Sequence, residues 1–453
     1  MNLNRQYISI VLLSVVLLSL HSCRKSNFRV EPSEIVISDN GAGIGTTTWV
    51  KGKNYLLQGR VFVNDGQVLT IEPGAVIRFA PGQGAAASAL IVARGGKIIA
   101  QGTAVDPIIF TAEADDLNGS LSIEEFGLWG GIILLGDAPV NTPSGENHVD
   151  GIPLSEPRAV YGGNNENDDS GILKYVSIRH AGTELSADNE INSLTLAGVG
   201  RKTIIENIEV IANADDGIEI FGGTVNLKRL IITYSEDDGL DVDLGYQGSI
   251  QFVCIIQHPN FGDKLLEIDG GEEIKTAHPY SLPIIYNLTA VGRGHDLYNN
   301  CVTFWDNAGG TIANSIFLNQ GYGVELEFSR ARHSSYTQWE IGNLNINNNI
   351  FYNVNNNQTE SFFKLLALND ENVDAEEALM QEYFHDAGNR FADPGFEVSG
   401  NKHFLISDSP VLKENIAPLP EGNTFLEEVP FKGAFGAYNW AAWTLSYQSG
   451  LLN

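Results

Sequence analysis

Basic residues are scarce in this sequence. Its 453 residues include 27 Lys and Arg against 56 Asp and Glu, which gives a formal net charge of −29 at pH 7. A surface this negative repels the phosphates of nucleic acid and anionic lipid headgroups, and it attracts cations. The charge balance therefore argues against a nucleic-acid-binding protein. Acidity also keeps a protein soluble without any ligand, so it does not by itself predict a cation site.

Cysteine is rare as well, with only Cys23, Cys254 and Cys301. Three thiols in a chain of this length do not form the disulfide framework of a small secreted protein. Cys254 and Cys301 lie in the apolar stretches "FVCII" and "CVTFW", where an unpaired thiol behaves as a small apolar group. The sequence therefore predicts two buried free thiols, and a bridge between them is the less favoured alternative.

Long apolar runs are missing except near the N-terminus, where Arg5 precedes the run Ile8–Leu20. This run is shorter than the roughly 20 residues that span a bilayer, but it has the length and basic flank of a secretory signal. It ends in "LHSC", which resembles the signal of bacterial lipoproteins, where the chain is cleaved before a cysteine that is then lipidated. We expect residues 1–22 to be a signal peptide and Cys23 to carry a lipid anchor. An ordinary signal peptide is the alternative.

The lipid anchor would attach the protein to the outer membrane of the cell envelope. The stretch "CRKSN" has no acidic residues after the cysteine, whereas a run of acids at this position resembles a signal for export to the cell surface. The sequence therefore favours the periplasmic side.

The periodicity of long amphipathic helices is absent from most of the chain. Instead, short β-branched segments recur between Gly, Asn and Asp, as in "IENIEVIANADDG" and "LKRLIITYSEDDG". Ile208 and Leu230 occupy equivalent positions 22 residues apart, and Val253 follows 23 residues later. A repeat of this length predicts an all-β fold, the parallel β-helix, in which inward Ile, Val and Leu form stacked rows. We expect the β-helix to span residues 51–366.

The two ends of the predicted solenoid differ from its middle. Residues 23–50, with the stretch "SDNGAGIGTTT", have the composition of a flexible linker. Residues 367–453 are expected to cover the open end of the core, because the last coil of a solenoid exposes unpaired backbone. They include one clear helical segment, with Asp374 as its cap and Leu379 and Phe384 on its apolar face. The aromatic stretch "VPFKGAFGAYNWAAWTLSYQSG" that follows predicts a C-terminal cap or packing strand.

Several motifs together resemble those of a known family. "GQVLTIEPGAVIRF", "ALIVARGGKIIAQGTAVDPIIFTA", "LWGGIILLG", "NADDGIEIFGGTVN" and "FKGAFG" are similar to segments of right-handed β-helix lipoproteins from Bacteroidetes-type bacteria. The resemblance covers most of residues 50–440. It implies the β-helix fold and a place in the cell envelope, but it implies little about activity, since a fold does not supply a function.

Acidic residues follow the turns of successive coils. In "GIEIFGG", "GLDVDLG" and "LLEIDGG" the alternation places apolar residues inside and acids outside. In this register Glu219, Asp241 and Glu267 stack on one another, with Asp243 and Asp269 beside them. Carboxylates at strand spacing repel by about 1 kcal/mol in water, and by about three to four times as much at a protein surface. These five residues form a candidate calcium ladder. The favoured alternative is that the acids extend into solvent, partly protonated or paired with Lys and Arg.

A catalytic interpretation of neighbouring residues is also open. Asn213 to Asp215, Asp237 with Asp238, and His258 resemble the Asn-x-Asp, Asp-Asp and His elements of polygalacturonases, which are β-helix hydrolases. Two carboxyl groups on adjacent coils could act as the acid and base of an inverting mechanism. However, "QHPN" replaces the Gly-His-Gly of those enzymes, and their Arg-x-Lys clamp is missing. Asp-Asp-Gly is also an ordinary turn sequence, because Asp accepts local backbone bonds and Gly tolerates positive φ.

A calcium-dependent polysaccharide lyase is a further enzyme alternative. It would need calcium together with a basic residue that abstracts a proton, for which Arg179 or Arg293 could be nominated. Sugar rings could also stack on aromatic side chains that are expected to point outward, namely Trp129, Tyr161, Trp305, Tyr322 and Trp339.

The sequence as a whole favours binding over catalysis, because no complete catalytic set can be assembled. We expect a lipid-anchored envelope protein that binds an acidic or neutral polysaccharide, or another envelope protein, with calcium as its one candidate cofactor. A polysaccharide hydrolase or lyase, and a purely structural envelope lipoprotein, are the alternatives.

Overall fold

The structure is a computed structural model that describes residues 34–186, 189–271, 276–294, 297–330, 332–369, 371–399 and 401–452. Residues Glu34–Asn453 form one compact unit. Cys23 and the predicted signal peptide lie outside the described residues.

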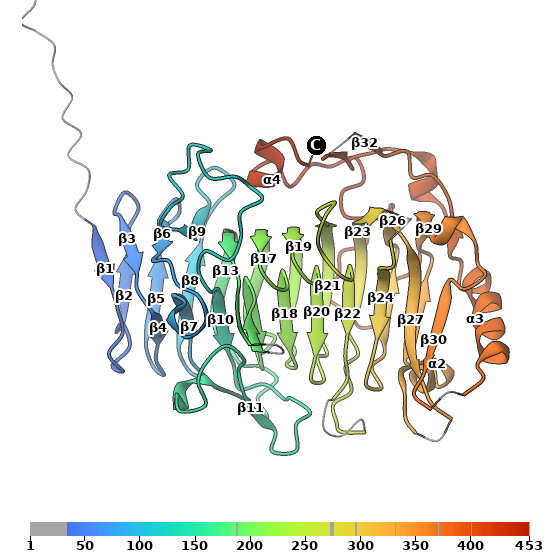
Figure 1. Cartoon of the computed structure of the whole chain (residues 1–453), viewed down its shortest axis with the longest axis horizontal. Helices are drawn as coiled ribbons and strands as arrows, with labels where there is room; N and C mark the ends of the chain where they lie inside the picture. The colour runs from blue at the N-terminus through green and yellow to red at the C-terminus, as the bar shows by residue number, and fades with distance from the viewer. Residues whose placement is uncertain are drawn as a thin grey trace, which may run out of the picture. The chain divides into compact units, whose positions relative to one another are not determined.

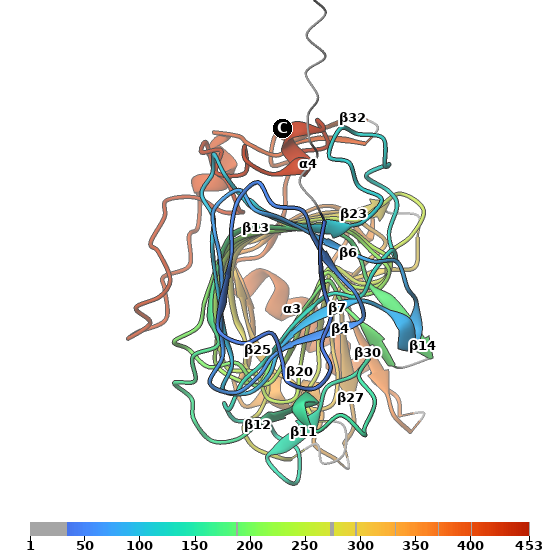
Figure 2. The ribbon, with the colours of Figure 1, turned by 90° about the vertical axis from the view of Figure 1, so that its left-hand side faces the viewer.

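Parallel strands stack coil upon coil along this unit, and the view along the stack shows the chain winding around a common centre (Figures 1 and 2). The fold is a right-handed parallel β-helix, as predicted. One wall is a 10-stranded sheet of short strands, each paired in parallel with its equivalent on the next coil. In chain order these strands are β4 (Arg60–Val63), β7 (Ala89–Val92), β10 (Ile132–Leu135), β16 (Leu194–Ala197), β18 (Ile218–Phe221), β20 (Leu240–Asp243), β22 (Leu266–Ile268), β24 (Asn300–Phe304), β27 (Tyr322–Phe328) and β30 (Phe363–Ala367).

A 17-stranded sheet bends around the rest of the core. Its central coils use long strands, which are β13 (Gly171–Ala181), β17 (Ile204–Asn213), β19 (Asn226–Ser235), β21 (Ser249–Ile256) and β23 (Ile284–Gly294). The outer coils use shorter ones, which are β1 (Ile35–Ile37), β2 (Thr47–Trp49), β3 (Tyr55–Leu57), β5 (Val68–Ile71), β6 (Val76–Phe79), β8 (Lys97–Gln101), β9 (Ile108–Ala112), β25 (Gly310–Ala313), β26 (Ile316–Gln320), β28 (Leu344–Asn347), β29 (Ile350–Val354) and β31 (Arg390–Phe391).

The remaining elements lie outside these two sheets. Three antiparallel hairpins pair β11 (Glu146–His148) with β12 (Val160–Gly162), β14 (Thr183–Ser186) with β15 (Asn189–Ile191), and β32 (Glu397–Ser399) with β33 (Lys402–Phe404). The helices are α2 (Ser335–Glu340), α3 (Asp374–Asp386) and α4 (Leu445–Gln448).

The predicted repeat and its register are confirmed. Ile208 pairs with Leu230, and Leu230 pairs with Val253, so 22 or 23 residues complete one coil in this region. The residues predicted to point inward are fully buried, namely Ile218, Ile220, Leu240, Val242, Leu266 and Ile268. Because each apolar row continues into the next coil, these side chains join one core cluster that extends from Trp49 to Phe384. Burial of this apolar surface is the main force that stabilises the fold.

The long strands turn a corner at one residue in the left-handed conformation. This residue recurs on successive coils as Tyr175, Asn207, Arg229, Phe252 and Asn287, with φ between 50° and 63°. Parallel pairing is interrupted at these positions and resumes on either side of them. Asn adopts this conformation more readily than a bulky residue does. The row of corners therefore bends the sheet around the core while the coils stay in register.

The insertion between β10 and β13 covers part of the outer face of the short-strand sheet. Phe62, Ile91 and Ile133 point outward at equivalent positions of β4, β7 and β10. All three are buried in a second apolar cluster that includes Tyr161 of the insertion. The acidic residues of the predicted ladder begin two coils further along the same row, where Thr195 pairs with Glu219.

The first coil begins before residue 51. β1 pairs with β3, and β2 pairs with β5. Between them the Asp39 carboxylate accepts hydrogen bonds from the N–H groups of Gly41 and Gly43 at 2.7 and 2.9 Å, and it forms an ion pair with Arg158 of the insertion at 2.5 Å. The part of the predicted linker that the structure describes therefore belongs to the β-helix.

Helix α3 covers the far end of the core, where Met380 and Phe384 are buried. Two details of the predicted helix are wrong. Asp374 is the first helical residue after Val373, and its carboxylate makes no capping hydrogen bond within the helix. Leu379 is 53% exposed, because the helix presents its Met380 edge to the core.

The aromatic C-terminal stretch does not cover the end of the core. Residues 405–452, which we name the return segment, run from the last coil back along the outside of the 17-stranded sheet (Figure 1). Gln251 makes two hydrogen bonds of 2.8 Å with the backbone of Glu427, and the Thr289 hydroxyl accepts one from the Ala434 N–H at 2.9 Å. Of the two predicted roles, a cap or a packing segment, the stretch has the second, and its docking position depends on polar side chains of distant strands.

Glu209 anchors the end of the return segment. Its fully buried carboxylate accepts hydrogen bonds from the N–H groups of Leu445 and Ser446 at 3.0 and 2.8 Å. It also accepts bonds from the hydroxyls of Ser446 and Ser177 at 2.8 and 2.6 Å. Hydrogen bonds to a buried charge are stronger than neutral ones, so this carboxylate fastens the segment to β17.

The expectation for the cysteines is confirmed, since Cys254 and Cys301 are both buried and unpaired. Burial raises the pKa of the Cys301 thiol well above its ordinary value, which keeps it protonated and unreactive. Among the described residues, no helix combines the length and the apolar character needed to cross a membrane.

We predict that Glu209→Ala releases the end of the return segment without unfolding the coils. The variant leaves two backbone N–H groups of the segment without an acceptor, at a cost of about 1–3 kcal/mol each. Hydrogen exchange should therefore accelerate in residues 441–452 and stay slow in β17 and β19. Glu209→Gln keeps an acceptor and should retain most of the protection. Equal exchange in the wild type and Glu209→Ala would contradict this role.

Candidate functional site: an acidic cluster on adjacent coils

The predicted stacking of acidic residues is present in the structure. Glu219 pairs with Asp241, and Asp241 pairs with Glu267, on β18, β20 and β22. Thr303 of β24 interrupts the row and Glu325 of β27 continues it. The row therefore has the register expected from the alternation of apolar and acidic residues.

Lysine residues compensate part of this row. Lys264 Nζ lies 2.9 Å from Glu267, 2.8 Å from Asp263 and 3.6 Å from Asp238. Although burial lowers it, the carboxylates of Asp238 and Glu267 raise the pKa of Lys264 well above its ordinary value. At the other end of the row, Lys364 Nζ lies 2.9 Å from Glu325.

Sequence reasoning missed Lys264, although a signal was available. Since Leu240 pairs with Leu266, the "GDKLL" motif places Lys264 in register with Asp238 of the preceding coil. The alignment of "EDDGL" with "GDKLL" therefore shows a base replacing an acid.

Glu219 and Asp241 remain without a cationic partner in the described part of the chain. Burial, together with the charge of Asp216, raises the pKa of Glu219 well above its ordinary value. Burial and the charge of Glu219 do the same to the pKa of Asp241. The Asn192 amide donates a hydrogen bond to Glu219, which offsets only part of this penalty. This section of the row is therefore the part that a bound cation would stabilise most.

Asp216 is a second residue that the sequence analysis missed. It belongs to a row of side chains that cap the backbone of the next coil: Asp216 N–H donates to Asn192 Oδ1 at 3.1 Å, Asp238 N–H to Asp216 Oδ1 at 2.9 Å, and Lys264 N–H to Asp238 Oδ1 at 2.6 Å. The aspartates of the two Asp-Asp-Gly motifs thus bond between coils. The expectation of local turn bonds was wrong for these atoms.

The glycines of the same motifs also have another role than expected. Neither Gly217 nor Gly239 has positive φ. A Cβ atom on Gly217 would lie 2.3 Å from Ile232 Cγ2, and one on Gly239 would lie 2.6 Å from Ile255 Cγ2. These positions require glycine because the coil passes close to the neighbouring strand.

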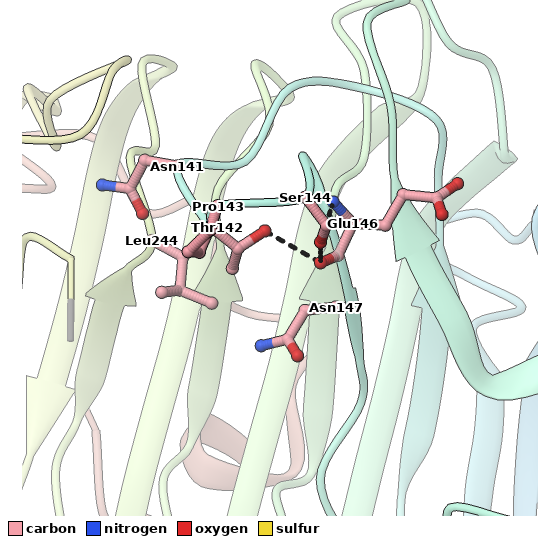
Figure 3. Close-up of a pocket in the computed structure, with 7 residues that line it drawn as sticks. All are labelled: Asn141, Thr142, Pro143, Ser144, Glu146, Asn147 and Leu244. Atoms are coloured by element: carbon pink, nitrogen blue, oxygen red, sulfur yellow. Dashed lines mark hydrogen bonds between the residues drawn. The ribbon is translucent and has the colours of Figure 1, made fainter. Parts of the chain in front are cut away.

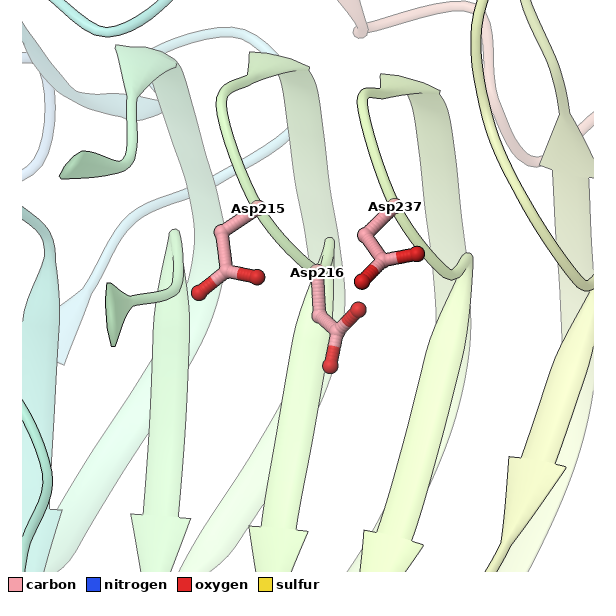
Figure 4. A group of neighbouring side chains, drawn as sticks. All are labelled: Asp215, Asp216 and Asp237. Atoms are coloured by element: carbon pink, nitrogen blue, oxygen red, sulfur yellow. The ribbon is translucent and has the colours of Figure 1, made fainter. Parts of the chain in front are cut away.

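The loops before β18 and β20 bring carboxyl groups together. Ligand atoms of Asp215, Asp216 and Asp237 all lie within 4.8 Å of one another, and so do those of Asp216, Glu219 and Asp241. Figure 4 shows the first group, in which the carboxyl groups of Asp216 and Asp237 lie side by side across two coils. We call these five residues the acidic cluster. A third group joins Asp237 and Asp238 to Asp263, beside Lys264.

The donor set of the acidic cluster suits a hard cation. Every candidate ligand atom is a carboxylate oxygen, which is the ligand type that calcium and magnesium prefer over zinc. Burial and the charge of Asp215 raise the pKa of Asp216 well above its ordinary value, so a divalent ion would have to displace protons as it binds. Calcium takes roughly six to eight oxygens, which leaves positions for water or for oxygens of a ligand.

Asp243 and Asp269, the other predicted ladder residues, lie beyond these groups. Asp243 is 6% exposed, and the Asp269 N–H donates to the Val242 carbonyl at 2.7 Å. Burial and the charge of Asp243 raise the pKa of Asp269 well above its ordinary value. Neither residue joins a close group of three ligands among the described residues. Of the five predicted ladder residues, Glu219 and Asp241 are the two that belong to such a group.

The predicted hydrolase set is only partly brought together. Asp215 and Asp237 lie in one carboxylate group. Asp238 lies in another, with Asp237 and Asp263, and its carboxylate is 3.6 Å from Lys264 Nζ. His258 has other partners, because its ring stacks on Phe261 at 4.0 Å and its Nε2 lies 3.7 Å from Glu124. Burial lowers the pKa of His258, and Glu124 partly restores it.

The two arginines nominated as bases of a lyase are also engaged elsewhere. Arg179 is buried, and its Nε donates to the Ser177 hydroxyl at 2.8 Å. Arg293 donates to the carbonyl groups of Gly262 and Asn260. Each guanidinium therefore has a structural role outside the acidic cluster.

Of the five aromatic residues proposed as sugar contacts, Trp129 and Tyr161 are buried, and Trp305, Tyr322 and Trp339 are half-buried. Trp129 is fully buried and stacks on Phe79 with ring centroids 3.8 Å apart, so its predicted outward position is wrong. Tyr161, which belongs to the insertion, is buried against the outer face of the short-strand sheet. Tyr322 is half-buried and lies 5.8 Å from the ring of Tyr298, which is 87% exposed. Tyr298 was missed because a single tyrosine in the loop "DLYNN" carries no periodic signal.

A small cavity of about 270 Å³ lies between the insertion and Leu244. Figure 3 shows that Thr142 and Ser144 turn toward the Glu146 carbonyl, to which their hydroxyls donate at 2.8 and 2.6 Å. The Glu146 carboxylate pairs with Arg94. The hydroxyls and the carboxylate of this cavity are therefore paired, whereas Asn141 Oδ1, a buried atom of a lining residue, has no hydrogen-bond partner among the described residues.

Comparison with known proteins agrees with the architecture. Residues 41–393 match the family model described as a pectate-lyase-like beta helix domain. No curated protein and no solved structure matches the chain. Because the match covers most of the chain and nearly all of its coils, this protein belongs to the family of pectate-lyase-like β-helix domains.

Proposed function

We propose that this protein is a lipid-anchored protein of the cell envelope that binds polysaccharide without cleaving it and holds calcium in its acidic cluster. The observation that carries the proposal is the convergence of the five carboxyl groups within two overlapping groups of ligand distance. The anchor would be Cys23, on the periplasmic side of the outer membrane. A carbohydrate ligand agrees with the pectate-lyase-like family of the domain.

Binding is favoured over lyase chemistry because, among the described residues, no basic side chain that could abstract a proton accompanies the acids. Lys264 is the basic residue that lies beside them, and its carboxylate neighbours keep it protonated. His258, Arg179 and Arg293 are held by other groups. Proton abstraction needs a base whose pKa lies near the working pH, and none of these residues supplies one at the acidic cluster.

An acidic polysaccharide is the ligand that best explains a cation site. A protein with a net charge of −29 repels a polyanion, whereas calcium bound by carboxylates keeps coordination positions that a uronate can fill. Tyr298 could provide a stacking surface nearby, because the adjacent Asn299 amide donates to Asp263 Oδ1 at 3.2 Å. The sugar would then bind through calcium and through an aromatic ring.

We predict that the metal-free protein loses stability as pH rises above about 4. The pKa values of Asp216, Glu219 and Asp241 are raised in the folded state, so the folded protein binds more protons than the unfolded chain, and this advantage disappears as pH rises through the folded values. Glu219→Gln removes one buried charge, so at pH 8 the metal-free Tm should increase by about 2–4 °C.

Calcium should raise the Tm of the wild type at pH 8 and raise that of Glu219→Gln less. Differential scanning calorimetry with EDTA or with calcium measures both effects. Glu113→Gln, at an exposed acid outside the cluster, is the matched control. An equal calcium effect in the wild type and Glu219→Gln would contradict a cation at this position.

We predict that Asp216→Asn weakens calcium-dependent binding of hexagalacturonate about tenfold, which corresponds to about 1.4 kcal/mol. The asparagine retains the Oδ1 acceptor that caps Asp238, so the coil should remain intact. Tyr298→Ala should weaken binding but leave the effect of EDTA on Tm unchanged. Isothermal titration calorimetry of the full chain in detergent measures the affinities, with Ile341→Ala as a control at an exposed apolar residue. Reducing ends released by the wild type and lost in Asp237→Ala would establish a hydrolase instead.

We also predict that Cys23→Ser abolishes incorporation of labelled palmitate and moves the protein from the membrane fraction to the soluble fraction. The serine cannot form the thioether to which the lipid is attached. Membrane association that persists in Cys23→Ser would contradict a lipid anchor at this residue.

A further inference from the structure

A cavity of about 630 Å³ separates the return segment from the corner of β13, β17 and β19. It is lined by Tyr175, Asn207, Arg229, Tyr438, Trp440 and Trp443, among others. It shares no residue with the acidic cluster. Its volume falls in the range of small-molecule sites, which is roughly 300–1,000 Å³.

Aromatic rings from two distant parts of the chain form its walls. Trp443 packs edge-on against Tyr175 with ring centroids 5.5 Å apart. Trp440 stacks on Phe435 at 5.1 Å, and its Nε1 donates to the Ala434 carbonyl at 2.8 Å. Tyr438 is 70% exposed. The cavity therefore combines fixed rings with one ring face that is open to a ligand.

The charged side chains of the cavity neutralise one another. Arg229 donates to Glu206 at 2.9 Å and to both carboxylate oxygens of Glu427 at 3.0 Å. Lys174 and Lys228 pair with the same two glutamates at 2.7 and 3.0 Å. With every charge paired, this surface suits a neutral polar ligand better than an ion.

Two polar groups in the lining of the cavity take no part in this network, namely Trp443 Nε1 and the Asn207 side-chain amide. Trp443 Nε1 is buried and has no hydrogen-bond partner among the described residues, which is unfavourable for a donor. Asn207 is 3% exposed, and its amide makes no hydrogen bond to another described residue. The cavity therefore offers a ligand an indole donor and an amide that can donate and accept.

The corner residues of this cavity have an unusual composition. Tyr175 and Arg229 have φ of 50° and 63° at positions equivalent to Asn207 and Asn287. A bulky side chain is disfavoured in this conformation, and asparagine is tolerated. These two bulky residues occupy the corners on either side of Asn207, so their side chains flank its amide in the lining of the cavity.

We propose that this cavity binds a neutral hexopyranose unit of a glycan, with the ring stacked on Tyr438 and its hydroxyls hydrogen-bonded to the Asn207 amide. Pyranose rings present an apolar face of C–H groups and a rim of hydroxyls, which matches an aromatic wall beside an amide and paired charges. This site needs no cation and does not depend on the acidic cluster.

The test uses the full chain in detergent with cellohexaose, maltohexaose and mannohexaose as neutral probes, and hexagalacturonate as the anionic probe. Saturation-transfer NMR and quenching of tryptophan fluorescence report binding. At least one neutral hexaose should bind equally well in EDTA and in calcium. Tyr438→Ala and Asn207→Asp should each weaken that binding at least about tenfold, and Tyr298→Ala should leave it unchanged.

Tyr438→Ala and Asn207→Asp should both fold. Tyr438 is exposed, so its replacement should leave the fold intact, and aspartate tolerates the left-handed conformation of residue 207. Failure of all three neutral probes to bind, binding of hexagalacturonate alone, or equal binding by Tyr438→Ala would overturn the proposal. Asp216→Asn and EDTA act on the acidic cluster only. If the calcium proposal for that cluster fails, binding of the neutral hexaose at this cavity is still expected.

Discussion

The stacking of equivalent residues on successive coils is the constraint on which the rest of this structure depends. Strands lie about 4.8 Å apart, so a side chain on one coil meets its equivalent on the next. Inside, this rule joins Ile218, Leu240 and Leu266 into an apolar row that excludes water. Outside, the same rule brings Glu219, Asp241 and Glu267 together and makes them repel. One spacing therefore produces both the core and the acidic row.

The structure relieves that repulsion unevenly, and this unevenness defines the candidate site. Lys264 and Lys364 neutralise the row at Glu267 and Glu325. Glu219 and Asp241 have no such partner among the described residues: Glu219 accepts one amide hydrogen bond, and burial favours the protonated form of both. Asp216 links the aspartates of the turns to the acids of the strands. Its carboxylate accepts a hydrogen bond from the Asp238 N–H and lies within ligand distance of both Glu219 and Asp237. Asp216 therefore caps the next coil through Oδ1 and belongs to both carboxylate groups of the acidic cluster.

The return segment connects coils that are not neighbours in the stack. Each coil contacts mainly its neighbours, which is typical of repeat proteins, whereas residues 405–452 bond to β17, β21 and β23 together. Its anchors are Glu209, Gln251 and Thr289, polar residues on a surface that a bare β-helix would leave in water. The aromatic cavity exists only because this segment crosses the corner row at Tyr175 and Arg229.

The sequence by itself determined the repeat, the inward residues and the stacking of the acids, because all three follow from alternation along a strand and from a fixed interval between coils. It did not determine the partner of each acid. The roles of Lys264 and Asp216 are visible only once the coils are set in register. His258 contacts Phe261 and Glu124 instead of the acids with which the sequence had grouped it. The path of the return segment was decided by tertiary structure alone, since its anchors lie about 145 to 240 residues away in the chain and no local pattern encodes such contacts.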